Sequence, residues 1–188
     1  MIARFWDVDE GCIKLGGTDI REYKLDSLLS NISMVFQNVF LFADSIENNI
    51  KFGRPDATRE DVIKAARKAC CDDFIEALPK GYDTVIGEGG ASLSGGEKQK
   101  VAFASVYAMN PDIYLLDEPS SNLDMTSIQE LKEHLRLIKK QGKTVLIAEH
   151  RLYYLMELAD RIVYLEKGEI KGIYTPEEFW QLSEPDRE

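Results

Sequence analysis

The alternation of strands and helices in the second half of this 188-residue chain constrains its fold more than any other feature. Three short apolar runs, at 113–116, 145–148 and 162–165, each follow a segment with helical patterning. Such alternation predicts an α/β fold with a parallel sheet whose two faces are covered by helices. In sheets of this kind, ligands bind beyond the carboxyl ends of the strands.

The composition narrows the class of protein. A hydrophobic fraction of 44% is enough for a packed core, and a net charge of -10 disfavours binding to nucleic acid. No apolar run approaches the ~20 residues that span a bilayer. The first ten residues turn acidic at once and have no apolar core, so we expect no signal peptide.

A helical segment interrupts the strand-rich parts of the chain. The apolar residues between 58 and 71 follow a helical stripe, and Thr58 and Asp61 have the spacing of a capping box. We therefore predict a helical subdomain at 38–94 and a partial core formed by 1–37 and 95–188. The cysteine pair within the stripe, Cys70 and Cys71, is expected to be two buried free thiols in a reducing compartment.

Adjacent carboxylates at Asp117 and Glu118 follow one of the apolar runs. One carboxylate at a strand exit can hold Mg²⁺ together with substrate phosphates, and the next can orient or deprotonate a water. Taken alone, the pair could equally be two charges that open a loop before Pro119. Gln37 and His150 also follow apolar runs and are expected at the same edge of the sheet, whereas His134, inside a helical segment, is expected on the surface.

A glycine pair lies at the start of a predicted helix, in the sequence Ser94-Gly95-Gly96-Glu97. Ser94 and Glu97 match a capping box. Two glycines in a first turn cost stability, about 1 kcal/mol each against alanine, so a function should compensate for them. Bare amides at a helix N-terminus form an anion site that a phosphate can approach closely.

These residues resemble the ATP-binding domain of ABC transporters, over essentially the whole chain. Five motifs of that family occur in its order. They are the Q-loop at Val35-Phe36-Gln37, the signature at Leu93–Glu97, the Walker B strand at Ile113–Glu118, the D-loop at Ser121–Asp124 and the switch region at Ala148–Arg151. The resemblance implies a P-loop-NTPase-like parallel sheet with a helical subdomain.

The resemblance also implies roles, with ATP and Mg²⁺ as cofactors. Asp117 and Gln37 would serve Mg²⁺, Glu118 would be the general base, and His150 would contact the γ-phosphate. The signature and D-loop residues would clasp the ATP of an opposite subunit; these are Ser94, Gly95, Gly96, Glu97 and Asp124. The implied partners are a second ATP-binding domain, as a homo- or heterodimer, and transmembrane domains at the cytoplasmic face of the cell membrane.

Two departures from the family pattern matter. The 188 residues contain no G-x-x-x-x-G-K-[ST] phosphate loop. The near match at Gly142-Lys143-Thr144 is better explained as the end of a helix with a basic last turn. The family's loop lies upstream of the position with which Met1 aligns, so we expect a truncation before or within it. The first half resembles exporter ATPases, and the half after Ser94 resembles energy-coupling-factor ATPases.

Three hypotheses for the function stay open at this point. The chain could be an ATPase subunit or fragment of an ABC transporter, which couples ATP binding and hydrolysis to transport. It could instead be a non-catalytic module whose signature face completes a partner's ATP site, or an inactive fragment. Soluble relatives in DNA repair or translation form a weaker third possibility, which the acidic composition disfavours.

Overall fold

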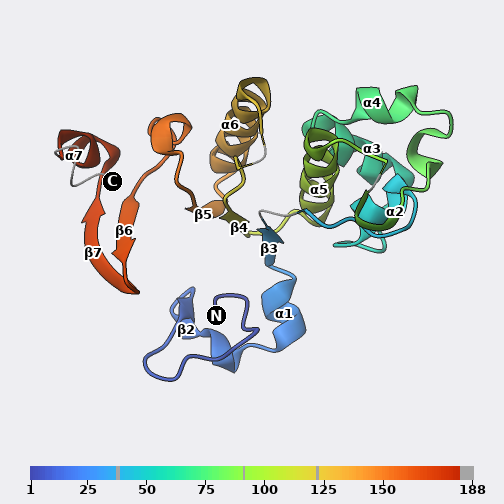
Figure 1. The fold of residues 1–188 in the computed structure, drawn as a ribbon. Coiled ribbons are helices and arrows are strands. Elements are labelled where there is room, and N and C mark those ends of the chain that lie inside the picture. The colour runs from blue at the N-terminus through green and yellow to red at the C-terminus, as the bar shows by residue number, and fades with distance from the viewer. Residues whose placement is uncertain (37–38, 91, 122, 183–188) are drawn as a thin grey trace.

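A three-stranded parallel sheet lies at the centre of the fold (Figure 1). The computed structural model describes residues 1–36, 39–90, 92–121 and 123–182. The strands are β3 (Ile32–Val35), β4 (Ile113–Asp117) and β5 (Thr144–Ala148), and they pair in the order β3-β4-β5. This arrangement confirms the predicted α/β fold with a parallel sheet.

The N-terminal segment forms a small unit below the sheet in Figure 1. A hairpin of β1 (Lys14–Leu15) and β2 (Thr18–Asp19) precedes the short helix α1 (Leu25–Leu29). The turn places Gly16 and Gly17 at φ of 57° and 86°, a conformation that favours glycine. A separate apolar cluster of Ile20, Leu28 and Ile32 connects this unit to β3.

Helices dominate the region between β3 and β4, on the right of Figure 1. They are α2 (Ile46–Lys51), α3 (Arg59–Lys68), α4 (Asp72–Ala77) and α5 (Gly95–Met109), with two 3-10 turns at Gly81–Asp83 and Glu88–Gly90. The helix α5 packs on α2 and α3 as well as on β3. It therefore joins the helical region to the sheet.

One continuous apolar core runs from the helical region into the sheet. The side chains of Ile46, Val62 and Val101 are fully buried at its helical end, and Tyr114 and Ile138 are buried at its sheet end. Helix α6 (Met125–Lys140) packs beside β5 and supplies the sheet side of this core. Because the core is shared, α5 and α6 have fixed positions over neighbouring parts of the fold.

The chain after β5 leaves the central sheet. In the segment of helical patterning before 162–165, the described structure has a short 3-10 turn at Leu152–Tyr154. It leads to β6 (Ile162–Glu166) and β7 (Glu169–Tyr174), which in the described structure form an antiparallel hairpin of their own, followed by α7 (Pro176–Gln181). Among the described residues, no helix is long and apolar enough to cross a membrane.

Two predictions of exposure were wrong. His134 is buried, because its face of α6 turns toward α5 rather than toward solvent. Cys71 is buried as expected, but Cys70 is exposed. Helix α3 has ended before Cys70, whose φ of 51° turns the chain and directs its thiol outward.

The segment at Gly142 is the end of a helix. Gly142 has a φ of 74°, and its amide donates to the carbonyl of Lys139 at 3.0 Å. The next residues lead directly into β5. This geometry is a glycine helix stop with a basic last turn, as the sequence predicted, and not a phosphate loop.

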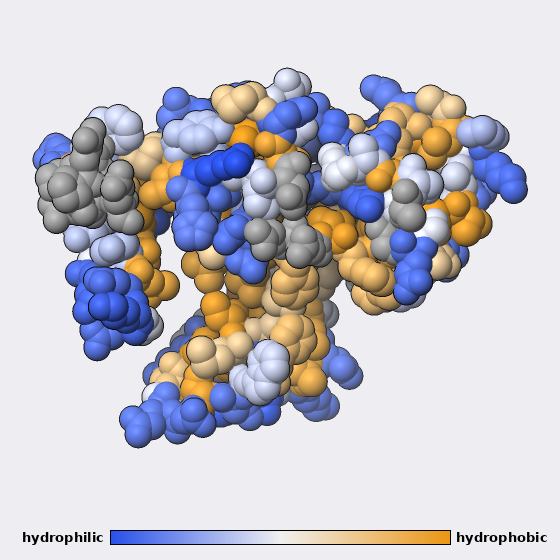
Figure 2. Space-filling view, viewed as in Figure 1, coloured by the Kyte–Doolittle hydropathy of each residue, from blue (hydrophilic) through white to orange (hydrophobic). Residues whose placement is uncertain are grey.

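Exposed apolar side chains gather on the C-terminal strands. Figure 2 shows hydrophobic residues on the inner side of the hairpin and over the middle of the molecule. The side chains that contribute are Leu146, Val163, Leu165, Ile170 and Ile173. Large exposed apolar patches favour association between molecules.

We therefore expect the 188-residue chain to self-associate in a concentration-dependent manner, measurable by size-exclusion chromatography with light scattering. Replacing the cross-strand neighbours Leu165 and Ile170 with lysine should reduce this association, because charge opposes burial of the patch. Leu137→Lys, at a similarly exposed position on α6, should not. A clean monomer with a sharp, cooperative melt would contradict the expectation.

Candidate functional site

The N-termini of α5 and α6 lie side by side. Ser94 caps α5, and its hydroxyl accepts from the Glu97 amide at 3.3 Å while the Glu97 carboxylate accepts from the Ser94 amide at 2.8 Å. Asp124 caps α6 and accepts from the Ser127 amide at 2.8 Å. That hydrogen bond lowers the pKa of Asp124, so the cap is charged at neutral pH.

The first turns of the two helices approach each other closely. A Cβ added to Gly96 would lie 3.9 Å from the Ser127 hydroxyl, whereas a Cβ added to Gly95 would meet nothing within 4 Å. A cleft of about 630 Å³ opens beside them. Its lining includes Ser94, Gly96, Glu97, Asp124 and Cys70. The start of α5 therefore borders a cleft, and no neighbouring atom lies within 4 Å of the position that a side chain on Gly95 would begin to fill.

A second group of predicted residues lies at the carboxyl ends of β4 and β5. Asp117 pairs in register with Ala148, and the Glu118 amide donates to the Ala148 carbonyl at 2.8 Å. His150 follows directly, and its Nε2 lies 3.3 Å from Oε1 of Glu118. Parallel pairing thus brings Asp117, Glu118 and His150 together, although about thirty residues separate them in the sequence.

Glu118 has an unusual backbone conformation. Its φ of 43° lies in the left-handed region, which a residue with a side chain adopts at a cost of about 1–3 kcal/mol. The hydrogen bond to the Ala148 carbonyl holds this conformation. Such strain persists only where the surroundings determine it, and it clusters at functional sites.

Glu149 is a site residue that the sequence analysis missed. Its carboxylate accepts from the Ser120 amide at 3.2 Å and from the Tyr154 hydroxyl at 2.8 Å. It also accepts from the amides of His150 and Arg151, at 2.9 and 3.1 Å. The carboxylate therefore connects the loop after β4 to the loop after β5.

The charge state of Glu149 follows from these contacts. Burial by itself would raise the pKa of Glu149, but the hydrogen bonds from Ser120, Arg151, Tyr154 and His150 outweigh it and lower the pKa. The carboxylate is therefore ionised at neutral pH. In the sequence, the position of Glu149 directly before His150 was the one indication that it connects the two loops, and no periodic pattern indicates such a connection.

A further contact ties α5 to the loop after β4. The buried amide of Gln99 donates to the Pro119 carbonyl at 2.5 Å. Arg151 donates to the neighbouring Ser120 carbonyl at 3.4 Å. The loop that carries Glu118 is thus held from both α5 and the loop after β5.

The residues fit a magnesium nucleotide in part. Asp117 and Glu118 offer two adjacent carboxylates. In the part of the chain that the structure describes, no group of three or more acidic, cysteine or histidine side chains could hold a metal ion by itself. Mg²⁺ suits such a site because it takes one or two carboxylates and completes its shell with waters and phosphates. The predicted ligand Gln37 lies outside the described residues.

Comparison with known proteins identifies the family. The sequence profile of the ABC transporter family matches residues 1–121. The chain therefore belongs to the ABC transporter family. One solved structure, described as that of a bacterial Atm1-family ABC exporter with ATP bound, is similar to this chain with a TM-score of 0.89 and 37% identity. The match covers 96% of this chain and 31% of that one.

Sequence relatives include a protein named for multidrug export and one named as a flippase. The putative multidrug export ATP-binding/permease protein YgaD of Bacillus subtilis is 43% identical over 95% of this chain and 30% of its own length. The ATP-dependent lipid A-core flippase of Syntrophus aciditrophicus is 46% identical over 90% of this chain and 28% of its own length. The chain thus spans less than a third of these relatives.

Glu149 gives a testable pH dependence of stability. Its lowered pKa means that the ionised carboxylate stabilises the fold above its unfolded pKa of about 4.3, and that this contribution disappears as the pH falls through the folded pKa. We expect Glu149→Gln to lower the free energy of unfolding by about 1–3 kcal/mol at pH 7, with a gap that stays constant down to about pH 4.3 and narrows as the pH falls further. Denaturant titrations over this pH range measure it. Glu166→Gln, at the end of β6, is the control, and an equal gap at all pH values would contradict the assignment.

Proposed function

We propose that this chain works as part of the ATP-binding domain of an ABC transporter, in which ATP binding and hydrolysis drive movement of a substrate across a membrane. Its signature face closes over ATP held by a second ATP-binding domain. One observation carries the proposal: the capped N-termini of α5 and α6 lie together beside a cleft, and a Cβ at Gly95 would meet nothing within 4 Å. Membership of the family and exporter relatives support it.

The signature face suits a phosphate. Amides in the first turn of α5 have no partners within the helix, and the helix dipole adds partial positive charge there. Ser94 fixes the first turn and Gly95 keeps the approach free of a side chain. Lys100 is close by but already paired with Glu130 at 2.8 Å. The backbone, rather than a free cation, is therefore the proposed ligand.

The second group of residues suits the hydrolytic step. ATP supplies the phosphoryl group, and the bound Mg²⁺ neutralises the negative charge of the phosphates. In this proposal Asp117 holds the metal, and Glu118 accepts a proton from a water. The His150 ring is 86% exposed beside Glu118, so it can turn toward a phosphate without leaving the loop that Glu149 fixes.

An aromatic surface near α2 is the proposed contact with transmembrane domains. Phe40, Phe42 and Phe52 are exposed, and the rings of Phe42 and Phe52 stack at 4.4 Å. The side chain of Asn49 bonds both the amide and the carbonyl of Phe42, which fixes this loop. Exposed apolar patches of this kind mark sites of interaction with another protein. Docking there would place the chain at the cytoplasmic face of the membrane.

We expect the 188-residue chain alone to have no measurable steady-state ATPase activity. It contains no phosphate loop whose amides and lysine could hold the β- and γ-phosphates, and the carboxylates at 117 and 118 do not replace that cradle. A coupled assay for released ADP measures this. Hydrolysis that disappears in Glu118→Gln would contradict the expectation.

The signature face can be tested with a partner. The partner is an ABC ATP-binding domain with an intact phosphate loop and a Glu→Gln change at its own base, so that it holds ATP without hydrolysing it. We expect ATP-dependent association with the wild-type chain, measured by light scattering. Gly95→Asp should abolish it, because it adds bulk and negative charge where a phosphate must sit.

Gly95→Asp should affect the signature face without disturbing the fold. A side chain at position 95 meets nothing within 4 Å in this chain, so the fold should tolerate the change. Gln141→Asp adds the same charge at the far end of α6 and should associate normally. Cys70→Ser is a second comparison that should change little, although Cys70 lines the cleft. Equal association of wild type and Gly95→Asp would overturn the proposed function.

A further inference from the structure

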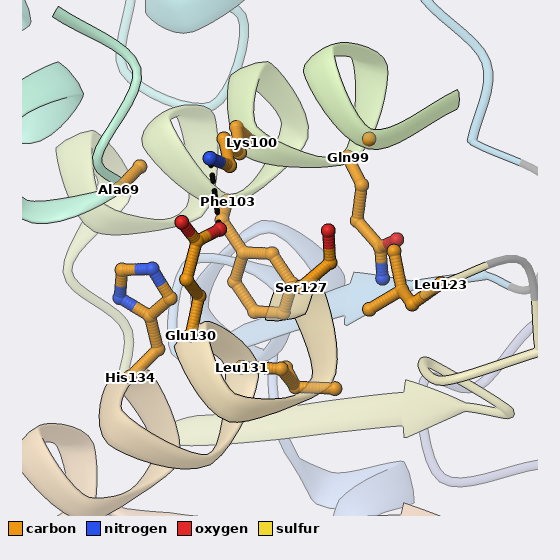
Figure 3. Close-up of a pocket in the computed structure, with 10 residues that line it drawn as sticks. Ala69, Gln99, Lys100, Phe103, Leu123, Ser127, Glu130, Leu131 and His134 are labelled. Atoms are coloured by element: carbon orange, nitrogen blue, oxygen red, sulfur yellow. Dashed lines mark ion pairs between the residues drawn. The ribbon is translucent and has the colours of Figure 1, made fainter. Parts of the chain in front are cut away.

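The two helices that carry the signature and the D-loop are joined along their length. Lys100 of α5 pairs with Glu130 of α6 at 2.8 Å, as Figure 3 shows. Two turns further along α5, the Tyr107 hydroxyl lies 3.0 Å from Nδ1 of His134, one turn further along α6. Both contacts advance in the same direction along the two helices, so the helices run roughly parallel and their N-termini lie at one end.

The distal contact is buried and uncharged. His134 is 6% exposed, and its ring stacks on Phe103 with centroids 6.0 Å apart. Burial lowers the pKa of His134 and raises the pKa of Tyr107. The Tyr107 hydroxyl and Nδ1 of the neutral histidine share one hydrogen bond, whose direction depends on the tautomer of the ring. The Tyr107–His134 contact therefore holds the two helices together within the core.

The proximal contact lies near the phosphate-facing end. Helix α5 packs on α2 and α3, and its side chains also contact α6 through the Lys100–Glu130 and Tyr107–His134 pairs. Lys100 and Glu130 each lie in the second turn of their helix, just behind Gly96 and Ser127. The ion pair thus lies between the buried contact at His134 and the two helix N-termini.

We propose that Lys100 and Glu130 form a positioning pair, which holds the signature and the D-loop in the relative position that closure over a partner's ATP requires. This inference rests on the function proposed above. The pair is partly exposed, with 27% and 36% of the two side chains accessible, so its effect on folding stability should be small. Its role is geometric, because it joins the helical region to the D-loop helix.

A charge swap separates positioning from other roles. In the association assay described above, Lys100→Glu and Glu130→Lys should each weaken ATP-dependent association about fivefold, because each places like charges together between the helices. The double variant restores the pair with reversed polarity and should return association to within about twofold of wild type. Thermal unfolding of each variant checks that the fold is retained. Lys64→Glu, in the exposed ion pair of α3, is the matched control.

The outcomes distinguish the inference from the proposed function. If Gly95→Asp abolishes association but both single swaps match wild type, the positioning pair is wrong and the proposed function stands. If the singles weaken association and the double variant does not rescue it, Lys100 acts by its own charge and the inference is overturned. If Gly95→Asp itself associates normally, the proposed function fails. If a charge-swap variant unfolds, Glu130→Gln takes its place, because glutamine keeps the shape of the side chain and removes the charge. Glu130→Gln should weaken ATP-dependent association, and association equal to that of wild type would overturn the proposed positioning pair.

Discussion

The pairing of β4 with both of its neighbours is the constraint on which the rest of this structure depends. Main-chain hydrogen bonds hold β4 between β3 and β5 in parallel register, so the ends of the three strands meet at one edge. That edge brings Asp117 and Glu118 beside His150. A slip of one residue would move alternate side chains to the opposite face and separate these groups.

Side chains then fix what the strands have brought together. The Glu149 carboxylate connects the loop after β4 to the loop after β5, and Gln99 connects α5 to the first of these loops. Each contact satisfies main-chain groups that the loops would otherwise leave without partners. The position of Glu118 therefore depends on three elements, and a change in α5 can reach it through a single side chain.

The signature face and the carboxylate edge are distinct parts of this chain. The first lies at the N-termini of α5 and α6, and the second at the carboxyl ends of β4 and β5. The same helix α5 carries the signature at its start and contacts the carboxylate loop through Gln99. Through Gln99, a movement of α5 at the signature face would therefore shift the loop that carries Glu118.

Local features of the sequence determined much of the architecture. The capping boxes at Thr58 and Ser94 form as predicted, because they need only residues three positions apart. The glycine stop after α6 and the hairpin at Gly16-Gly17 are equally local. Alternating patterns predicted the parallel sheet, and family motifs marked the residues at its edge. The role of Gln37 stays a prediction, because that residue lies outside the described part.

Only the tertiary structure decided which polar residues are buried or shared between elements. His134 was expected at the surface, yet it lies on the stripe of α6 that carries Leu131 and is buried where that stripe meets Tyr107 of α5. Glu149 and the Lys100–Glu130 pair join segments about thirty residues apart, and no periodicity records such partners. A sequence pattern reports the face of one element, whereas burial and pairing depend on which other element that face meets.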